Sequence, residues 1–130
     1  MDTSPGKILG IGGIFFKSAH RDDLRKWYGE KLGIPQTEWG SLFHWRSKEE
    51  PAKDHMTIWS VFTETSDYFA PSSQSFMINY IVDDLEAFLI KLRAAGVKID
   101  PKREDHDYGK FGWIFDSDGN KIELWEPLPK

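Results

Sequence analysis

The sequence predicts a single α+β domain in which two similar βαβββ modules form one cupped, mixed sheet. Two observations predict this fold class. The segment DDLRKWYGEKLGI at residues 22–34 has a counterpart, DDLEAFLIKLRAAGV, at residues 83–97. Downstream of each segment, a Phe-x-Trp triplet precedes a short apolar strand ending in Trp, first at Trp59 and again at Trp125. An internal repeat of this length indicates two related structural units in one domain.

Module one is assigned to residues 7–64 and is predicted to begin with a strand over residues 8–17, where three Gly indicate close backbone approach. Apolar residues then recur at helical spacing from residue 21 to residue 32, and Gly33 favours a helix end. Three further strands are expected at residues 36–39, 42–47 and 55–63. A linker rich in polar residues and Pro follows at residues 65–75.

Module two is assigned to residues 76–126 and repeats the pattern. A strand is predicted over residues 76–82 and a helix over residues 83–95, which Gly96 stops. The remaining strands are expected at residues 97–103, 111–115 and 121–125. The Asp-Gly pair between the last two strands is a strong hairpin signal. A four-stranded sheet with one helix leaves its other face open, so two such sheets side by side can enclose a ligand.

Composition limits the classes of function. The chain has 130 residues, no Cys and a formal charge of −4 with scattered Lys and Arg, so disulfides are excluded and nucleic acid is not an expected partner. No apolar run is long enough to cross a membrane, and the N-terminal residues are polar, so a soluble cytoplasmic protein is expected. Aromatic residues make up 15 %, with six Trp, which exceeds what a small core requires and indicates an aromatic pocket.

The repeat and the closing segment resemble the vicinal-oxygen-chelate superfamily of glyoxalases, bleomycin-resistance proteins and extradiol dioxygenases. The resemblance is carried by residues 23–33, by Val82-Asp83-Asp84-Leu85 and by the ending DSDGNKIELWE at residues 116–126. It implies the glyoxalase-like fold of paired βαβββ modules, a homodimer, and a small molecule bound in the cup.

The same resemblance implies a divalent metal, held by one ligand from the first strand and one from the last strand of each module. Glu123 matches the last-strand position of module two, and the repeat places Thr57 at the equivalent position of module one. The first-strand positions fall on Gly13 and Met77, neither of which suits a hard or borderline divalent ion. We therefore expect no metal cofactor, with Glu123 the one matching ligand if a metal is held.

Two histidines, His44 and His55, lie near strands of module one, but no His-x-His or His-Glu pairing at strand spacing accompanies them. Scattered single histidines are usually structural. Because His44 alternates with Phe43 and Trp45, it is expected to point away from the face that they occupy.

Strand alternation predicts which side chains face the cup. If Glu123 faces it, Trp125 does too, and the repeat places Thr57 and Trp59 beside them. The candidate ligand-binding residues are mostly aromatic with a few small polar groups, a composition typical of small-molecule pockets: Phe15, Trp45, Thr57, Trp59, Met77, Asn79, Trp113 and Trp125. Glu123 is the candidate catalytic residue, as a general acid or base or as an anchor for a cationic or hydroxylated ligand. The alternative is a carboxylate that merely accepts hydrogen bonds from Tyr or Trp donors.

These features favour a protein that binds a small organic molecule in an aromatic cup without a metal. One alternative is a metal-dependent, glyoxalase-like lyase or isomerase, or a dioxygenase, acting on a small metabolite. Another is a non-catalytic dimerisation module whose cup is filled by its own side chains.

Overall fold

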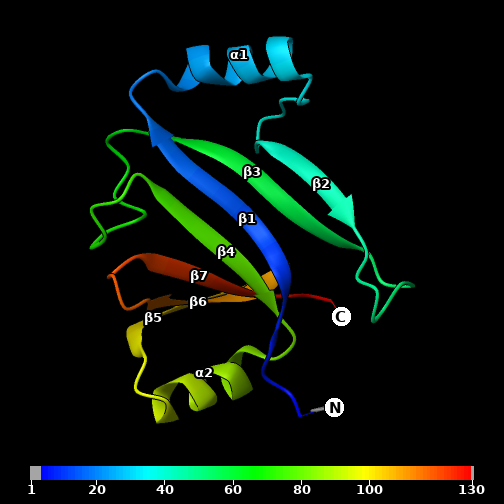
Figure 1. Cartoon of the computed structure of the whole chain (residues 1–130), viewed down its shortest axis with the longest axis vertical. Coiled ribbons are helices and arrows are strands. Elements are labelled where there is room, and N and C mark those ends of the chain that lie inside the picture. Colours follow the sequence, from blue (N-terminus) through cyan, green and yellow to red (C-terminus); the bar gives the residue numbers. More distant parts are fainter. Residues whose placement is uncertain (1–3, 130) are drawn as a thin grey trace.

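The computed structural model describes residues 4–129 as one open, seven-stranded mixed sheet with two helices (Figure 1). The strand order is β2-β3-β1-β4-β7-β6-β5. The strands are β1 (Ile8–Ser18), β2 (Ser41–Trp45), β3 (His55–Thr63), β4 (Phe76–Val82), β5 (Lys98–His106), β6 (Gly109–Phe115) and β7 (Lys121–Pro127), and the helices are α1 (Arg21–Leu32) and α2 (Leu85–Ala94).

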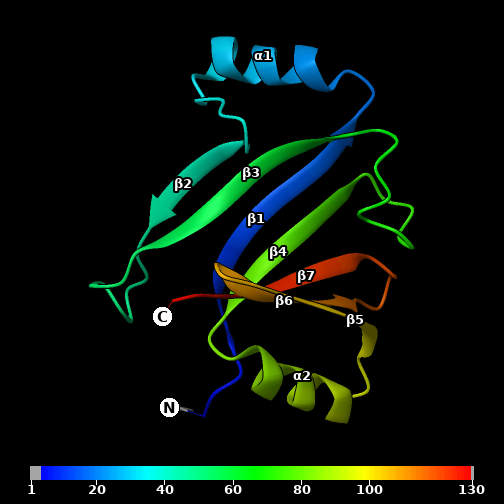
Figure 2. The same ribbon diagram turned by 180° about the vertical axis from the view of Figure 1, so that it is seen from behind.

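The topology repeats across the middle of the sheet. Strands β1 and β4 are antiparallel neighbours and join the two halves. In each half the first strand is parallel to the last, β1 to β3 and β4 to β7, and antiparallel strands extend outward from there. The two helices lie at opposite ends of the molecule (Figures 1 and 2). The predicted α+β class and glyoxalase-like architecture are confirmed.

Both helices form where the sequence predicts them. Gly33 ends α1 in the left-handed conformation (φ 71°), and its N–H donates to the Tyr28 carbonyl. Helix α2 starts at Leu85, two residues later than expected, because the side chain of Asp84 caps the helix by accepting from the Ala87 N–H at 3.0 Å. Asp83 instead accepts from the backbone N–H groups of the segment before β1.

The predicted strand at residues 36–39 is wrong. Thr37 and Gly40 exchange backbone hydrogen bonds of 3.0 and 3.2 Å with each other, which closes a tight turn instead of a ladder. Gly40 has φ +107°, and the side chain of Arg25 donates to Gln36 Oε1 and to the Thr37 carbonyl. The backbone groups that a strand would need are therefore already engaged, and module one has three strands rather than four.

The core has two parts on opposite faces of the sheet. Under α2, the buried residues are Val82, Leu85, Leu89, Ile114 and Leu124. On the opposite face, which we call the concave face, the buried cluster is Phe15, Phe69, Met77 and Trp113. Helix α1 has no buried residue and lies over the outer face of module one, where Tyr28 packs against Trp59 with ring centroids 4.8 Å apart.

The predicted facing of β7 is confirmed, whereas that of β3 is wrong. Ile122 and Leu124 pack with the α2 cluster, so Glu123 and Trp125 occupy the concave face. On β3, however, Trp59 packs against Phe16 and Tyr28 on the α1 side, and Ile58 packs with the concave cluster. Side chains alternate strictly along a strand, so a repeat alignment that is off by one residue exchanges the two faces.

Candidate functional site

Glu123 lies on the concave face and is 3 % exposed. Three neutral groups donate hydrogen bonds to its carboxylate: the Tyr68 hydroxyl, Asn79 Nδ2 at 2.7 Å and Trp113 Nε1 at 3.0 Å. Asn79 and Trp113 stand directly opposite Glu123 on β4 and β6, so the sheet register itself brings these groups together. Asn79 Oδ1 is buried without a hydrogen-bond partner, and Gly12 leaves it room.

The β3–β4 loop, residues 64–75, seals this part of the concave face. Its Phe69 is fully buried and packs with Phe15, Met77 and Trp113. Its Tyr68 carries the hydroxyl that reaches Glu123, and Lys121 Nζ donates to the Tyr68 carbonyl at 2.8 Å. The loop therefore fills the space over Glu123 with side chains of the protein itself.

Burial is the main cause of the shifted pKa values of the ionisable groups around Glu123. Desolvation raises the pKa of Glu123 above its usual range, although the hydrogen bonds from Tyr68, Asn79 and Trp113 oppose the shift. Desolvation and the neighbouring Glu123 raise the pKa of Tyr68, which keeps its hydroxyl protonated as a donor. Burial lowers the pKa of Lys121.

The residues around Glu123 do not form a set of metal ligands. The row of residues that crosses the four central strands at this level is Ile58, Gly13, Asn79 and Glu123. Ile58 and Gly13 offer no side-chain ligand atom, which leaves the Asn79 amide oxygen and the Glu123 carboxylate as the ligand atoms of this row. Within residues 4–129, no group of three or more His, Asp or Glu side chains converges at metal-binding distance. A divalent ion needs several such ligands.

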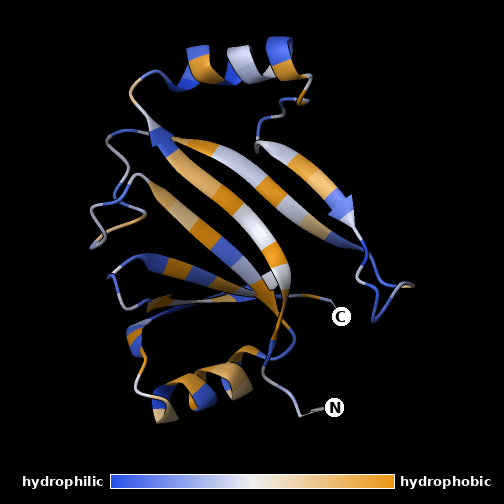
Figure 3. Cartoon of the chain, viewed as in Figure 1, coloured by the Kyte–Doolittle hydropathy of each residue, from blue (hydrophilic) through white to orange (hydrophobic). Residues whose placement is uncertain are grey.

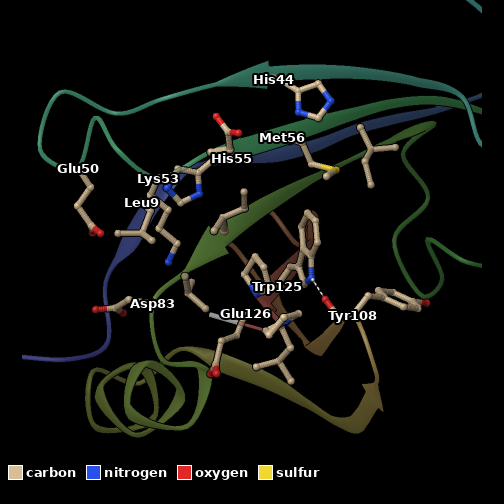
Figure 4. A pocket seen from close by; sticks show the side chains of 17 residues that line it. Leu9, His44, Glu50, Lys53, His55, Met56, Asp83, Tyr108, Trp125 and Glu126 are labelled. Carbon is tan, nitrogen blue, oxygen red and sulfur yellow. Dashed lines mark hydrogen bonds between the residues drawn. The ribbon is translucent and has the colours of Figure 1, made fainter.

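A separate pocket of about 560 Å³ lies further along the concave face (Figure 4). Strands β2 and β3 line one side of it, and β7 with the turn between β5 and β6 lines the other, which shows that the sheet curves around it. Its walls are Leu9, His44, Glu50, Lys53, Asp54, His55, Met56, Ile58, Ile81, Val82, Asp83, Tyr108, Trp125, Glu126, Pro127, Leu128 and Pro129.

The pocket has a charged end and an aromatic end. Figure 4 shows Glu50, Lys53 and Asp83 together on one side, with Trp125 and Tyr108 on the other. Trp125 is held by two contacts. It stacks on Phe111, with centroids 5.9 Å apart, and its Nε1 donates to the Tyr108 carbonyl at 3.4 Å. Gly109 is required beneath it, because a Cβ there would lie 2.2 Å from that nitrogen.

The structure separates the predicted site residues into three groups. Trp125 lines the pocket. Phe15, Met77, Asn79, Trp113 and Glu123 lie on the concave face but are packed against each other or against the β3–β4 loop. Trp45, Thr57 and Trp59 lie on the outer face, where Trp45 Nε1 donates to Thr57 Oγ1 at 2.8 Å. The prediction that these three side chains face the cup is wrong. The repeat alignment of β3 is off by one residue, which exchanges the faces of Thr57 and Trp59, and Trp45 shares their face.

Sequence reasoning missed most of the pocket lining. His44 stands opposite Met56 and shares its face, so it points into the pocket while Phe43 and Trp45 point outward. The predicted alternation of His44 with Phe43 and Trp45 is confirmed, but His44 is on the inner face and the two aromatic residues are on the outer one. A second signal was the Tyr68-Phe69 pair, whose two adjacent aromatic residues are unusual in a polar linker and indicated a buried loop.

Comparison with known proteins identifies the family. The model of the Glyoxalase/Bleomycin resistance protein/Dioxygenase superfamily matches residues 19–124. The chain therefore belongs to this superfamily, as its motifs predict. A search of curated proteins gave no significant match.

Solved structures share the fold at low sequence identity. A methylmalonyl-CoA epimerase from Mycobacterium tuberculosis superposes with a TM-score of 0.60 at 18 % identity, covering 99 % of this chain and 93 % of the other. A Streptomyces coelicolor methylmalonyl-CoA epimerase in complex with 2-nitronate-propionyl-CoA gives a TM-score of 0.68 at 13 % identity, covering 95 % and 100 %. In the described part of the chain, neither helix has the length and apolarity needed to span a bilayer.

Proposed function

We propose that this protein binds a small organic molecule in the pocket between β2–β3 and β7, and that it does so without a metal at Glu123. The pocket itself is the observation that carries the proposal. Its volume of about 560 Å³ is within the range of small-molecule sites, and most of its lining surface is apolar, with charged side chains at one end.

The arrangement around Glu123 supports the metal-free part of the proposal. Both carboxylate oxygens already accept hydrogen bonds from buried donors, so an ion there would leave buried N–H and O–H groups without partners. The role of Glu123 in this proposal is to hold Tyr68 and the β3–β4 loop in place. It is not assigned a catalytic role.

The fold shared with methylmalonyl-CoA epimerases supports a ligand-binding concave face but assigns no substrate to this chain. A metal-dependent lyase or isomerase is the main alternative, and elemental analysis of protein purified without chelators tests it. A stoichiometric divalent ion that is lost in Glu123→Gln would contradict the metal-free proposal.

A cytoplasmic homodimer is part of the proposal. Ile11, Ile14 and Phe43 are large apolar residues of module one that remain 38–45 % exposed, which supports a covered surface in solution. Sedimentation equilibrium tests this part, and a monomer at micromolar concentration would contradict it.

Fluorescence titration against a metabolite library tests the pocket. Trp125 is in the pocket wall, so a bound ligand should change its emission, and Trp125→Ala should weaken binding strongly. Trp27→Ala is the matched control, because Trp27 lies on α1 outside the pocket and is 47 % exposed. Equal loss of affinity in both variants, or a library without any binder, would refute the proposal.

A further inference from the structure

We propose that β2 pairs antiparallel with β2 of a second copy of this chain, so that two sheets join edge to edge in a dimer. This inference rests on the homodimer of the proposed function, because it names the strand through which the two copies meet. It is carried by the position of β2 at an open edge of the sheet, by its uncharged sequence and by the charges on either side of it.

β2 occupies an edge position that its counterpart in module two does not occupy. The Phe-x-Trp triplet of the repeat lies in β2 at residues 43–45 and in β6 at residues 111–113. β6 lies between β7 and β5, whereas β2 has only β3 beside it (Figures 1 and 2). The missing neighbour corresponds to the strand expected at residues 36–39, which forms a turn. β2 is therefore an edge strand whose counterpart is an interior one.

The backbone along the open side of β2 is available to another strand. In an antiparallel pair, every second residue directs its N–H and C=O toward the neighbouring strand, and the residues between direct theirs away from it. Among residues 4–129, the backbone hydrogen bonds made outside helices and strands include none to residues 41–45. A row of such unpaired groups is a template for a further strand.

Side chains protect one edge of the sheet and not the other. β2 has the sequence SLFHW, without Pro, Lys, Arg, Asp or Glu. Leu42 and Phe43 point to opposite faces and are 47 % and 45 % exposed, and Figure 3 shows the middle of β2 as hydrophobic. β5, at the other edge, contains Pro101, charged residues along its length and an irregular register between Ile99 and Arg103. These features block pairing at an edge, so β2 is the edge that remains open.

A second copy of β2 matches this edge. Two antiparallel copies of one strand are related by a twofold axis, which brings the same surface of each copy together. An axis through Phe43 pairs all five residues of the strand and places Leu42 of one copy opposite His44 of the other. Opposite residues share a face, and His44 lines the pocket, so Leu42 of the second copy extends the pocket wall.

Charges at the two ends of β2 are complementary in this arrangement. Because the strands run in opposite directions, the turn before β2 in one copy approaches the segment after β2 in the other. Glu38 and Lys48 are both exposed and lie five residues before and five residues after Phe43. The axis through Phe43 therefore brings Glu38 of each copy toward Lys48 of the other, and opposite charges meet at both ends.

Disulfide cross-linking tests the pairing and its register, because the chain contains no Cys. Opposite residues of antiparallel strands have Cα atoms about 4.5–5.5 Å apart, which is within the range that a disulfide spans. Phe43→Cys should therefore form a covalent dimer under mild oxidation about tenfold faster, or more, than random collision allows, because pairing concentrates the two thiols at one place. Ile90→Cys measures random collision, because Ile90 lies on α2 and is 63 % exposed.

Sedimentation equilibrium of two lysine variants separates the β2 edge from the outer face of module one. Leu42→Lys places a charge beside the open edge on the concave side, and it should raise the dimer Kd about tenfold or more, because like charges in an interface oppose association. Ile14→Lys is the matched control. Ile14 is 38 % exposed and stands opposite Trp59, on the outer face of the central strand β1, so its variant should leave the dimer Kd unchanged.

A charge reversal tests the contacts at the ends of the strand. Glu38→Lys should raise the dimer Kd about two- to fivefold, the range expected for exposed ion pairs, and adding Lys48→Glu should restore it. A double variant that dimerises no better than Glu38→Lys would contradict the axis through Phe43.

The outcomes separate this inference from the proposed function. A dimer that survives Leu42→Lys but dissociates in Ile14→Lys keeps the homodimer and refutes the β2 contact. Cross-linking that is no faster in Phe43→Cys than in Ile90→Cys refutes the pairing as well. A wild-type chain that stays monomeric at micromolar concentration overturns both the homodimer and the β2 contact, while the fluorescence titration tests the pocket independently.

Discussion

Phe69→Ala tests whether the β3–β4 loop is an integral part of the core. Phe69 is 0 % exposed and packs with Phe15, Met77 and Trp113, and it contacts Phe62 with ring centroids 5.1 Å apart. Truncating a fully buried Phe removes its transfer free energy and leaves a cavity, a combined cost of about 3–5 kcal/mol. Small domains have unfolding free energies of about 5–15 kcal/mol, so this loss is a large part of the total.

Urea denaturation followed by tryptophan fluorescence measures the effect, with Trp39→Ala as the control. Trp39 is 76 % exposed, and its truncation should change the free energy of unfolding by no more than about 0.5 kcal/mol. If Phe69→Ala costs no more than Trp39→Ala, the loop only lies against the sheet, and our account of the sealed carboxylate is wrong.

Three further predictions concern single positions. Because burial raises the pKa of Glu123, the native state binds this proton more tightly than the unfolded chain. The free energy of unfolding should therefore fall as pH rises from the ordinary glutamate range through the raised native pKa, and Glu123→Gln should flatten this decline in denaturation curves measured across pH. Gly109→Ala should lower the free energy of unfolding by about 1–3 kcal/mol and shift tryptophan emission, because the new Cβ collides with Trp125. Gly29→Ala is the control, because its Cβ meets nothing closer than 3.5 Å, and it should stabilise α1 by about 0.5–1 kcal/mol. Asp84→Ala should lower the unfolding free energy by about 1 kcal/mol through loss of the α2 cap, and an unchanged thermal midpoint would contradict the capping role.

Helices and strands were predicted well wherever the local sequence pattern was strong. The apolar spacing and Gly33 predicted both ends of α1, and the strand predicted at residues 76–82 matches β4 in full. The strand expected at residues 36–39 does not form, because local strand propensity carries no information on contacts with residues far away in the sequence. Its backbone groups are engaged by a turn and by Arg25, which reaches them from α1.

The candidate site was predicted less well, for a reason of register. Trp59 on β3 and Trp125 on β7 look equivalent in sequence, yet Trp59 packs under α1 while Trp125 faces the pocket. Aligning them shifted β3 by one residue and exchanged Thr57 for Ile58. Pairing between strands, which sets the register, is a long-range property that a repeat in the sequence does not contain.

Glu123 is covered by the loop between β3 and β4, whereas the curved sheet is held together by backbone hydrogen bonds between its strands. Lys17 is the β1 residue whose N–H meets this connection, donating to the Ser75 carbonyl at 2.7 Å. Changes in the length or composition of residues 64–75 can therefore cover or uncover Glu123 while the strand pairing stays intact. The exposure of this carboxylate is thus set by a segment outside the sheet.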